Sequence, residues 1–324
     1  MPSPNDAGVE TRTAGLQWLR CSAAGGHYLL PAHRIAGIHR GESVRPSWDA
    51  GGPAGWMETP QGRVPVHRLS RLLGQPDDET LFPAVMTLEG SQGTWAISAS
   101  RVSRVTASVE AIPLPPIAAG VWRLASEAMV MDGAVELCLD TGRLEDVAFG
   151  HAAKPAGAEP APAVPPATPV AAGKASGTGR ILTFTLPGDP FRGALLTLAV
   201  SFTQVLELTG ALPMAEIPGA PEHLLGVTIW RGRTVPVVDL AYCLGGERAN
   251  APGARLLVAR AARSAMPICF PVDETSGTVA AAALCERASE PWQARVPCVR
   301  AAFDASGVPM LVPDFDTLLR AGGS

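Results

Sequence analysis

One strand-turn-helix pattern occurs twice in this chain, as QGRVPVHRLSRLLG at 61–74 and as GRTVPVVDLAYCLG at 232–245. An offset of 171 residues (235 − 64) makes six of eleven consecutive positions identical, and the same offset aligns Gly55 with Gly226. This agreement predicts a duplicated domain rather than a solenoid of short repeats. The identical positions are Val64, Pro65, Val66, Leu69, Leu73 and Gly74 in the first copy and Val235, Pro236, Val237, Leu240, Leu244 and Gly245 in the second.

Each copy is expected to form a strand that runs into a short helix. The β-branched run interrupted by proline is typical of an edge strand, where the missing N–H breaks no ladder bond. Asp239 is placed to cap the helix. Leu240 and Leu244 would share one helix face, and Gly245 would end the helix in the left-handed conformation. Arg68 replaces the aspartate in the first copy, so the packing face is kept there and the cap is lost.

Length and composition predict about two domains. The 324 residues, 47% of them hydrophobic, supply enough apolar side chains for two cores. Residues 152–178 contain six prolines and no apolar side chain larger than valine, which is typical of an extended spacer. The division expected is a disordered N-terminus (1–13), a first lobe (14–150), an Ala/Pro-rich linker (151–178) and a second lobe (179–324).

Charge and hydropathy exclude several classes of protein. The net charge is −4, and no basic stripe is interleaved with aromatic residues, so nucleic-acid binding is not expected. The first residues lack a basic segment followed by an apolar core, so we expect no signal peptide. Apolar stretches are far shorter than the roughly 18 residues that span a bilayer. The six cysteines form no CxxC pair, which favours reduced, buried thiols in a cytoplasmic protein.

The periodicity of the lobes predicts short strands separated by turns, which is typical of small barrels. The alternation in ILTFTLPGD (181–189) predicts a hairpin into the next apolar run, and a turn at Gly25-Gly26 gives the first lobe the same layout. Segments 134–144 and 308–319 each contain a strand, an aspartate and a leucine four residues later. An offset of 174 aligns Asp140 with Asp314, so the duplication extends nearly to the end of each lobe.

Catalytic and metal-binding patterns are missing from the sequence. It contains no GxGxxG, GxxxxGK[ST], GxSxG or HExxH motif. His27, His33 and His39 are evenly spaced but have no paired cysteines or carboxylates nearby, so a metal site is not favoured. Asp239, Asp273 and Glu274 could be imagined as paired acids, but Asp239 has the capping role described above, and a lone acid that follows a strand is usually structural. We expect no enzyme activity and no cofactor.

The second lobe resembles the CheW-like domain of chemotaxis coupling proteins over almost all of 179–322. Four short motifs are the most specific. They are the Pro-x-x-Leu-x-Gly motif at 221–226, the Arg-Gly pair at 231–232, the strand VPVVDL at 235–240 and the Val-Asp pair at 272–273.

The first lobe resembles a diverged member of the same family. It keeps Gly55, the Val-Pro-Val run and Asp140. It has Pro60 where the arginine of the Arg-Gly pair is expected, and Ala99 where the aspartate of the Val-Asp pair is expected.

This resemblance implies a mainly β protein with two CheW-like domains, each made of two SH3-like five-stranded β-barrels with short helices. It implies an adaptor that couples the tips of methyl-accepting chemoreceptors to the regulatory domain of a CheA-type histidine kinase, without direct membrane insertion. The alternative is a structural interaction protein whose lobes mediate assembly without contacting a kinase. The receptor- or kinase-binding positions that the resemblance implies are Val205, Glu207, Gly226, Arg231, Gly232, Pro236, Val237 and Asp239.

A comparison of the lobes predicts one ion pair. Aligning residues 35–38 with 205–208 places Gly37 opposite Glu207, just as Pro60 stands opposite Arg231. The acid and the base are therefore absent together from the first lobe, as expected if they pair in the second. The alternative is that both are ordinary surface charges, since exposed ion pairs contribute only about 0 to 1 kcal/mol.

Limited proteolysis is expected to cut the chain within 152–178 and to leave two folded fragments. The linker cannot bury enough apolar surface to fold, whereas each lobe contains a complete copy of the repeat. Mass spectrometry would locate the cuts, and circular dichroism would report the structure of each fragment. A fragment that is unfolded by itself would show that the two-domain division is wrong.

Overall fold

A computed structural model of the chain contains two compact units, one formed mostly by the first 151 residues and the other mostly by the remainder. Residues 1–13 and the linker 151–178 lie outside the part that the structure describes. The described residues are 18–47, 52–60, 62–76, 82–105, 111–115, 124–150, 180–187, 197–244, 246–248, 253–260, 266–273, 275–280, 299–303 and 309–316.

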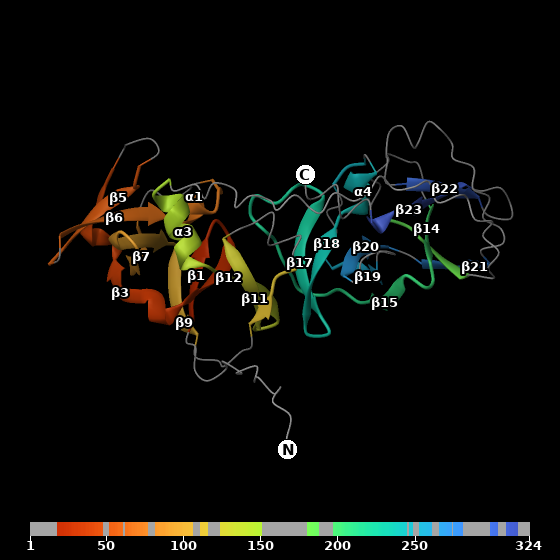
Figure 1. The fold of residues 1–324 in the computed structure, drawn as a ribbon, viewed down its shortest axis with the longest axis horizontal. Coiled ribbons are helices and arrows are strands. Elements are labelled where there is room, and N and C mark those ends of the chain that lie inside the picture. Colours follow the sequence, from red (N-terminus) through yellow and green to blue (C-terminus); the bar gives the residue numbers. More distant parts are fainter. Residues whose placement is uncertain are drawn as a thin grey trace, which may run out of the picture. The chain divides into compact units, whose positions relative to one another are not determined.

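The first lobe is built mainly from short strands (Figure 1). Its elements are β1 (Trp18–Ala23), β2 (Gly26–Pro31), η1 (Ala32–Arg34), β3 (Ile35–Arg40), η2 (Gly41–Ser43), β4 (Val44–Pro46), β5 (Gly55–Thr59), β6 (Gly62–Arg68), α1 (Leu69–Leu72), β7 (Ala84–Gly90), β8 (Gly93–Ala99), β9 (Arg101–Val105), β10 (Ile112–Pro113), β11 (Ala125–Met131), β12 (Ala134–Leu139) and α3 (Thr141–Ala148).

The second lobe repeats this composition of short strands with a single-turn helix. Its described elements are β13 (Arg180–Phe184), β14 (Thr197–Ser201), β15 (Val205–Thr209), β16 (Met214–Ala215), β17 (Leu224–Trp230), β18 (Arg233–Val238), α4 (Leu240–Cys243), β19 (Arg255–Arg260), β20 (Pro267–Val272), β21 (Thr275–Ala280), β22 (Val299–Phe303) and β23 (Pro309–Pro313).

The two lobes have the same topology. One sheet of the first lobe has the order β3-β7-β8-β6-β5-β4, and its counterpart in the second has the order β15-β19-β20-β18-β17-β16. The other sheets, β11-β12-β2-β1-β9 and β22-β23-β14-β13-β21, also correspond strand by strand. The predicted mainly β fold and the duplication are therefore confirmed. Three of the four sheets have six strands rather than five, because very short strands (β4, β10 and β16) add to their edges.

The strand register agrees with the 171-residue offset. Gly55 pairs with Val66 in the first lobe, and Gly226 pairs with Val237 in the second. The two edge strands β3 and β15 also share an irregularity, since each has a register shift at equivalent residues, between Ile35 and Gly37 and between Val205 and Glu207. The alignment that places Gly37 opposite Glu207 is thus supported by the backbone.

The prediction that the proline-containing strands lie at sheet edges is wrong. β6 lies between β5 and β8, and β18 lies between β17 and β20. The fold tolerates each proline because the pairing with the neighbouring parallel strand begins one residue after the proline. It begins at Val66 with β8 and at Val237 with β20. At Pro65 and Pro236 the strand is paired on one side only, so the missing N–H removes no bond from the parallel ladder.

The helix signals of the repeat behave as predicted. The Asp239 carboxylate accepts a hydrogen bond from the Tyr242 N–H at 3.1 Å and caps α4, whereas Arg68 makes no side-chain cap on α1. Asp140 accepts bonds from the amides of Gly142 and Arg143, and Asp314 accepts one from the amide of Asp316. The helix that follows the last strand of each lobe is therefore capped in the same way.

Glycine ends the first helix as predicted. Gly74 has φ +68°, its N–H donates to Arg71 O, and the Gln75 N–H donates to Ser70 O. These two bonds form the Schellman motif, which satisfies the last carbonyls of a helix. Gly245 lies outside the described residues, but the Gly246 N–H donates to Ala241 O as the same motif requires.

The first hairpin is confirmed with a turn one residue earlier than predicted. β1 pairs with β2 from Trp18–Pro31 down to Ala23–Gly26, and the two turn residues are Ala24 and Gly25, both with positive φ. β13 pairs with β14 as expected, but the predicted turn at 187–189 lies mostly outside the described residues.

His67 is buried in an aromatic cluster of the first lobe. Its ring centroid lies 6.2 Å from that of Trp95 on β8 and 5.5 Å from that of Phe149, which follows α3. The side chain is 7% exposed, and its Nε2 has no hydrogen-bond partner. Burial therefore lowers the pKa of His67 below its ordinary value of 6.5. α3 itself lies beside α1 (Figure 1).

The stability of the first lobe is expected to fall as the pH drops below 6.5. The folded state binds the His67 proton more weakly than the unfolded state does, so stability is fully present above that pH and is lost below it. Hydrogen exchange of peptides from α3 and β6 would measure this. His67→Phe should remove the dependence, whereas His33→Phe, at an exposed position, should keep it. An unchanged pH profile in His67→Phe would contradict the assignment.

Candidate partner-binding surface

The turn between β17 and β18 holds Arg231 in an unusual backbone conformation. Trp230 pairs with Arg233, which leaves Arg231 and Gly232 as a two-residue loop. Both have positive φ, 49° for Arg231 and 71° for Gly232. This combination is typical of a type I′ turn, whose twist matches that of the flanking strands. The arginine therefore projects from a turn whose shape is set by the hairpin.

Three side chains meet at this hairpin tip. Glu207 on β15 places its Oε2 2.7 Å from Arg231 Nη2 and accepts a hydrogen bond from Trp230 Nε1 at 3.0 Å. The guanidinium carbon of Arg231 lies 4.8 Å from the centroid of the Trp230 ring. The predicted ion pair is therefore present, and the tryptophan contacts both of its members. We call Glu207, Trp230 and Arg231 the hairpin-tip cluster.

The hairpin-tip cluster is accessible to solvent. The Arg231 side chain is 68% exposed and that of Glu207 is 36% exposed. An ion pair in such a position contributes little to folding, about 0 to 1 kcal/mol, because water screens it. Its effect is to fix the direction of a planar guanidinium group whose remaining N–H donors face outward. The arrangement can recognise a carboxylate or a carbonyl oxygen next to an apolar surface.

Sequence reasoning missed Trp230. From its residue type alone, Trp230 could equally be a core tryptophan. Its contact with Glu207 depends on β15 lying beside the hairpin tip, which the local sequence does not show. The signal that could have found it is its position directly before the Arg-Gly turn, where the two-residue loop turns the chain back on itself.

Gly226 has a structural reason to be glycine. Its φ is +152°, and a Cβ there would lie 2.2 Å from Ala215 O on β16. At the equivalent Gly55, a Cβ would lie 2.9 Å from Arg45 O on β4. In both lobes the glycine lets the short edge strand approach the hairpin backbone. Gly226 therefore positions the hairpin instead of presenting a side chain.

The other predicted positions divide between surface and interior. Val205 lies on β15 with Glu207 and is half-buried. Pro236 is buried, and Val237 and Asp239 are each 1% exposed. Their side chains build the core and the helix cap, so any effect of these residues on binding would act through the fold. Glu207, Arg231 and Gly232 are the predicted positions that the structure brings together at the surface.

The buried cysteines are poorly suited to nucleophilic chemistry. Burial raises the pKa of the Cys21 and Cys269 thiols to about 12, and burial also raises that of Cys138. A thiol with so high a pKa carries almost no thiolate near neutral pH. In the described part of the chain no group of three or more histidines, cysteines and acids is arranged to hold a metal ion.

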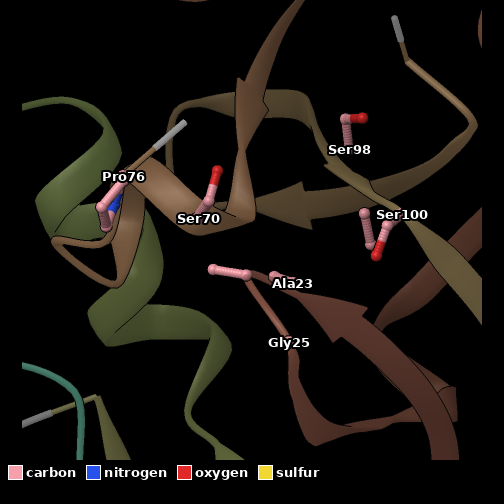
Figure 2. A pocket seen from close by; sticks show the side chains of 8 residues that line it. Ala23, Gly25, Ser70, Pro76, Ser98 and Ser100 are labelled. Carbon is pink, nitrogen blue, oxygen red and sulfur yellow. The ribbon is translucent and has the colours of Figure 1, made fainter. Parts of the chain in front are cut away.

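A cavity of about 300 Å³ lies in the first lobe between the β1–β2 turn, α1 and the end of β8 (Figure 2). Its polar side chains are the hydroxyl groups of Ser70, Ser98 and Ser100. The Ser100 hydroxyl donates to Ser22 O at 2.7 Å, so it is used within the fold. No histidine, acid or lysine lines the cavity to activate a serine, and none of the predicted binding positions does either.

Comparison with known families identifies the second lobe. Residues 181–322 match the family model of the CheW-like domain, so this part of the chain is a CheW-like domain, and the first lobe shares its topology. A similar solved structure is the scaffolding protein TtCheW from Thermoanaerobacter tengcongensis, with 13% sequence identity and a TM-score of 0.34 over 40% of this chain and 91% of that one. No curated protein matches the sequence. None of the described helices is long and apolar enough to cross a membrane.

Glu207→Gln is expected to release the Arg231 side chain without unfolding the lobe. The amide has the size of the carboxylate but no charge, so the guanidinium loses its ion pair. The order parameter of the Arg231 Nε–Hε group, measured by nitrogen-15 relaxation, should fall below about 0.6, the range of flexible groups. That of Arg63, in the first lobe, should not change. Equal mobility of Arg231 in the two proteins would show that Glu207 does not orient it.

Proposed function

We propose that this protein is a non-enzymatic adaptor of a chemotaxis-type signalling complex inside the cell. In this proposal the second lobe couples the tips of methyl-accepting chemoreceptors to the regulatory domain of a CheA-type histidine kinase. The match of 181–322 to the CheW-like domain carries the proposal. It is supported by the hairpin-tip cluster, which gives the domain an exposed and oriented cation.

The geometry suits recognition of a helical receptor surface. Arg231 uses one Nη for Glu207 and is mostly exposed, so further N–H donors face solvent. A planar guanidinium can bind a carboxylate through two parallel hydrogen bonds, which fixes orientation as well as affinity. The half-buried ring of Trp230 and the half-buried Val205 supply apolar surface on the same hairpin and on β15. A charged group beside apolar surface gives specificity to such an interface.

The second candidate is a structural interaction protein whose lobes mediate assembly without contacting a kinase. The observation that favours it is the first lobe, which has the CheW-like topology but lacks both charges of the ion pair at Gly37 and Pro60. A pull-down with the regulatory domain of the kinase separates the two candidates. Retention of that domain by the second lobe favours the coupling function, and retention by neither lobe favours the assembly function.

Arg231→Glu is expected to weaken receptor binding by roughly tenfold or more while the fold stays intact. The substitution reverses a charge that the structure presents to solvent, and such charges affect recognition more than stability. Glu207→Arg should have a similar effect, and the double exchange should recover part of the loss by more than about 0.5 kcal/mol of coupling. Co-sedimentation with receptor arrays measures binding, and circular dichroism reports the fold.

Arg255→Glu, at an exposed position on β19 of the same lobe, is the matched control and should bind receptors normally. If all three variants of the hairpin tip also bind normally, the hairpin tip is not the receptor-binding surface. If the losses of receptor binding in the two single variants are additive in the double variant, the hairpin tip is the receptor-binding surface but the ion pair has no role in binding.

A further inference from the structure

The first lobe has a tryptophan and two arginines on the outer face of its β4–β5–β6 strands. The guanidinium carbon of Arg63 on β6 lies 4.3 Å from the centroid of the Trp56 ring on β5. On the other side, Arg45 on β4 is the direct cross-strand partner of Trp56, so their side chains lie on the same face. The tryptophan is therefore flanked by two cations. We call Arg45, Trp56 and Arg63 the tryptophan face.

The charges of the tryptophan face are available for a partner. Arg45 and Arg63 are exposed, and neither forms an ion pair within the described part of the lobe. The nearest acid by register is Glu58, which is also exposed and stands directly opposite Arg63. Arg63 stacks on Trp56 without forming an ion pair with this acid. Two guanidinium groups and one carboxylate leave the face with a net charge of +1.

The second lobe shows that this fold does not need such a face. The strand pairing places Ala215 and Val227 at the positions of Arg45 and Trp56, since these two also pair directly across the sheet. The 171-residue offset places Thr234 at the position of Arg63. All three are small or apolar and at most 9% exposed. The tryptophan face is thus particular to the first lobe, and it occurs on the hairpin that carries Arg231 in the second.

We infer that the tryptophan face binds an acidic segment of a protein partner, one that presents a carboxylate beside an apolar side chain. The carboxylate would pair with Arg45 or Arg63, and the apolar side chain would pack on the half-buried ring of Trp56. Tryptophan and arginine dominate the binding energy of many protein interfaces, because each supplies a large contact surface together with directed polar groups.

Charge complementarity favours an acidic protein segment over a nucleic acid. Stacked tryptophan and arginine side chains can also hold a base, but single-stranded nucleic acids need a positive groove that follows several phosphates. Glu58 lies within the face, so the face offers two separate cations and no continuous positive track for successive phosphates.

The inference goes beyond the proposed coupling function and does not depend on it. The hairpin-tip cluster pairs an arginine with a glutamate and is balanced in charge, whereas the tryptophan face is positive. The tryptophan face would therefore give the first lobe its own site for an acidic partner, one that does not use Arg231.

Selection from a library of short random peptides displayed on phage tests this with the full chain as bait. Peptides rich in Asp or Glu next to Leu, Phe or another apolar residue are expected to be enriched. Their affinity, measured by isothermal titration with synthetic peptides, should fall at least about tenfold in Arg45→Ala or Arg63→Ala and in Trp56→Ala. Trp56→Phe, which keeps an aromatic ring, should lose less.

Two variants serve as controls. Arg101→Ala removes an exposed arginine from β9 of the same lobe and should bind the peptides normally. Arg231→Ala disables the hairpin-tip cluster and should also bind them normally, which separates this inference from the proposed function. Circular dichroism of each variant shows whether it is folded, and Arg45→Gln and Arg63→Gln replace any variant that is not.

The inference is overturned if no acidic peptide depends on the tryptophan face, whether because none is enriched or because the enriched ones bind all variants equally. It is also overturned if fluorescence anisotropy with a single-stranded oligonucleotide shows binding that depends on Arg45 and Arg63 while the acidic peptides do not bind. Loss of peptide binding in Arg231→Ala with no effect of Arg63→Ala would assign the peptides to the second lobe and would equally overturn it.

Discussion

In each lobe, the hairpin that carries a candidate surface lies very close to a short edge strand at one glycine. At Gly226 a side chain would collide with Ala215 O, and at Gly55 it would collide with Arg45 O and with Val44 Cγ1. Only a residue without a Cβ lets the short edge strand lie against the hairpin at these points. The hairpin β17–β18 is thereby held against β16, and β5–β6 is held against β4.

Local rules could be predicted from the sequence, and long-range pairing could not. The repeat, the caps at Asp239 and Asp140 and the left-handed stop at Gly74 depend on residues within a few positions of one another, so their patterns are visible in one segment. The edge position predicted for the proline strands failed, because the length of the parallel pairing with β8 and β20 depends on segments about 30 residues away. Trp230 was missed for the same reason, since Glu207 reaches it from another strand.

The divergence of the first lobe has a backbone component as well as a side-chain one. Arg231 has φ 49°, but the ring of a proline holds φ near −65°, so Pro60 cannot adopt the conformation of its counterpart. The first lobe therefore lacks both the cation and the turn geometry that aims it, because one residue, Pro60, replaces Arg231. Gly37 stands where the second lobe has Glu207, so the acid that such a cation would pair with is also absent from this position. An arginine introduced at position 60 alone would have neither the Glu207 counterpart nor the flanking sequence of the second lobe.

Buried and exposed ion pairs in this chain have different consequences for experiments. Arg20 and Glu136 form a two-point ion pair in the first lobe, and the Glu136 side chain is 2% exposed. Removing one partner of such a pair leaves a buried charge and destabilises a protein by about 3 to 5 kcal/mol. Loss of binding after such a change would report unfolding. Arg231, Arg45 and Arg63 are exposed, so their substitution leaves no buried charge, and a loss of binding reports recognition.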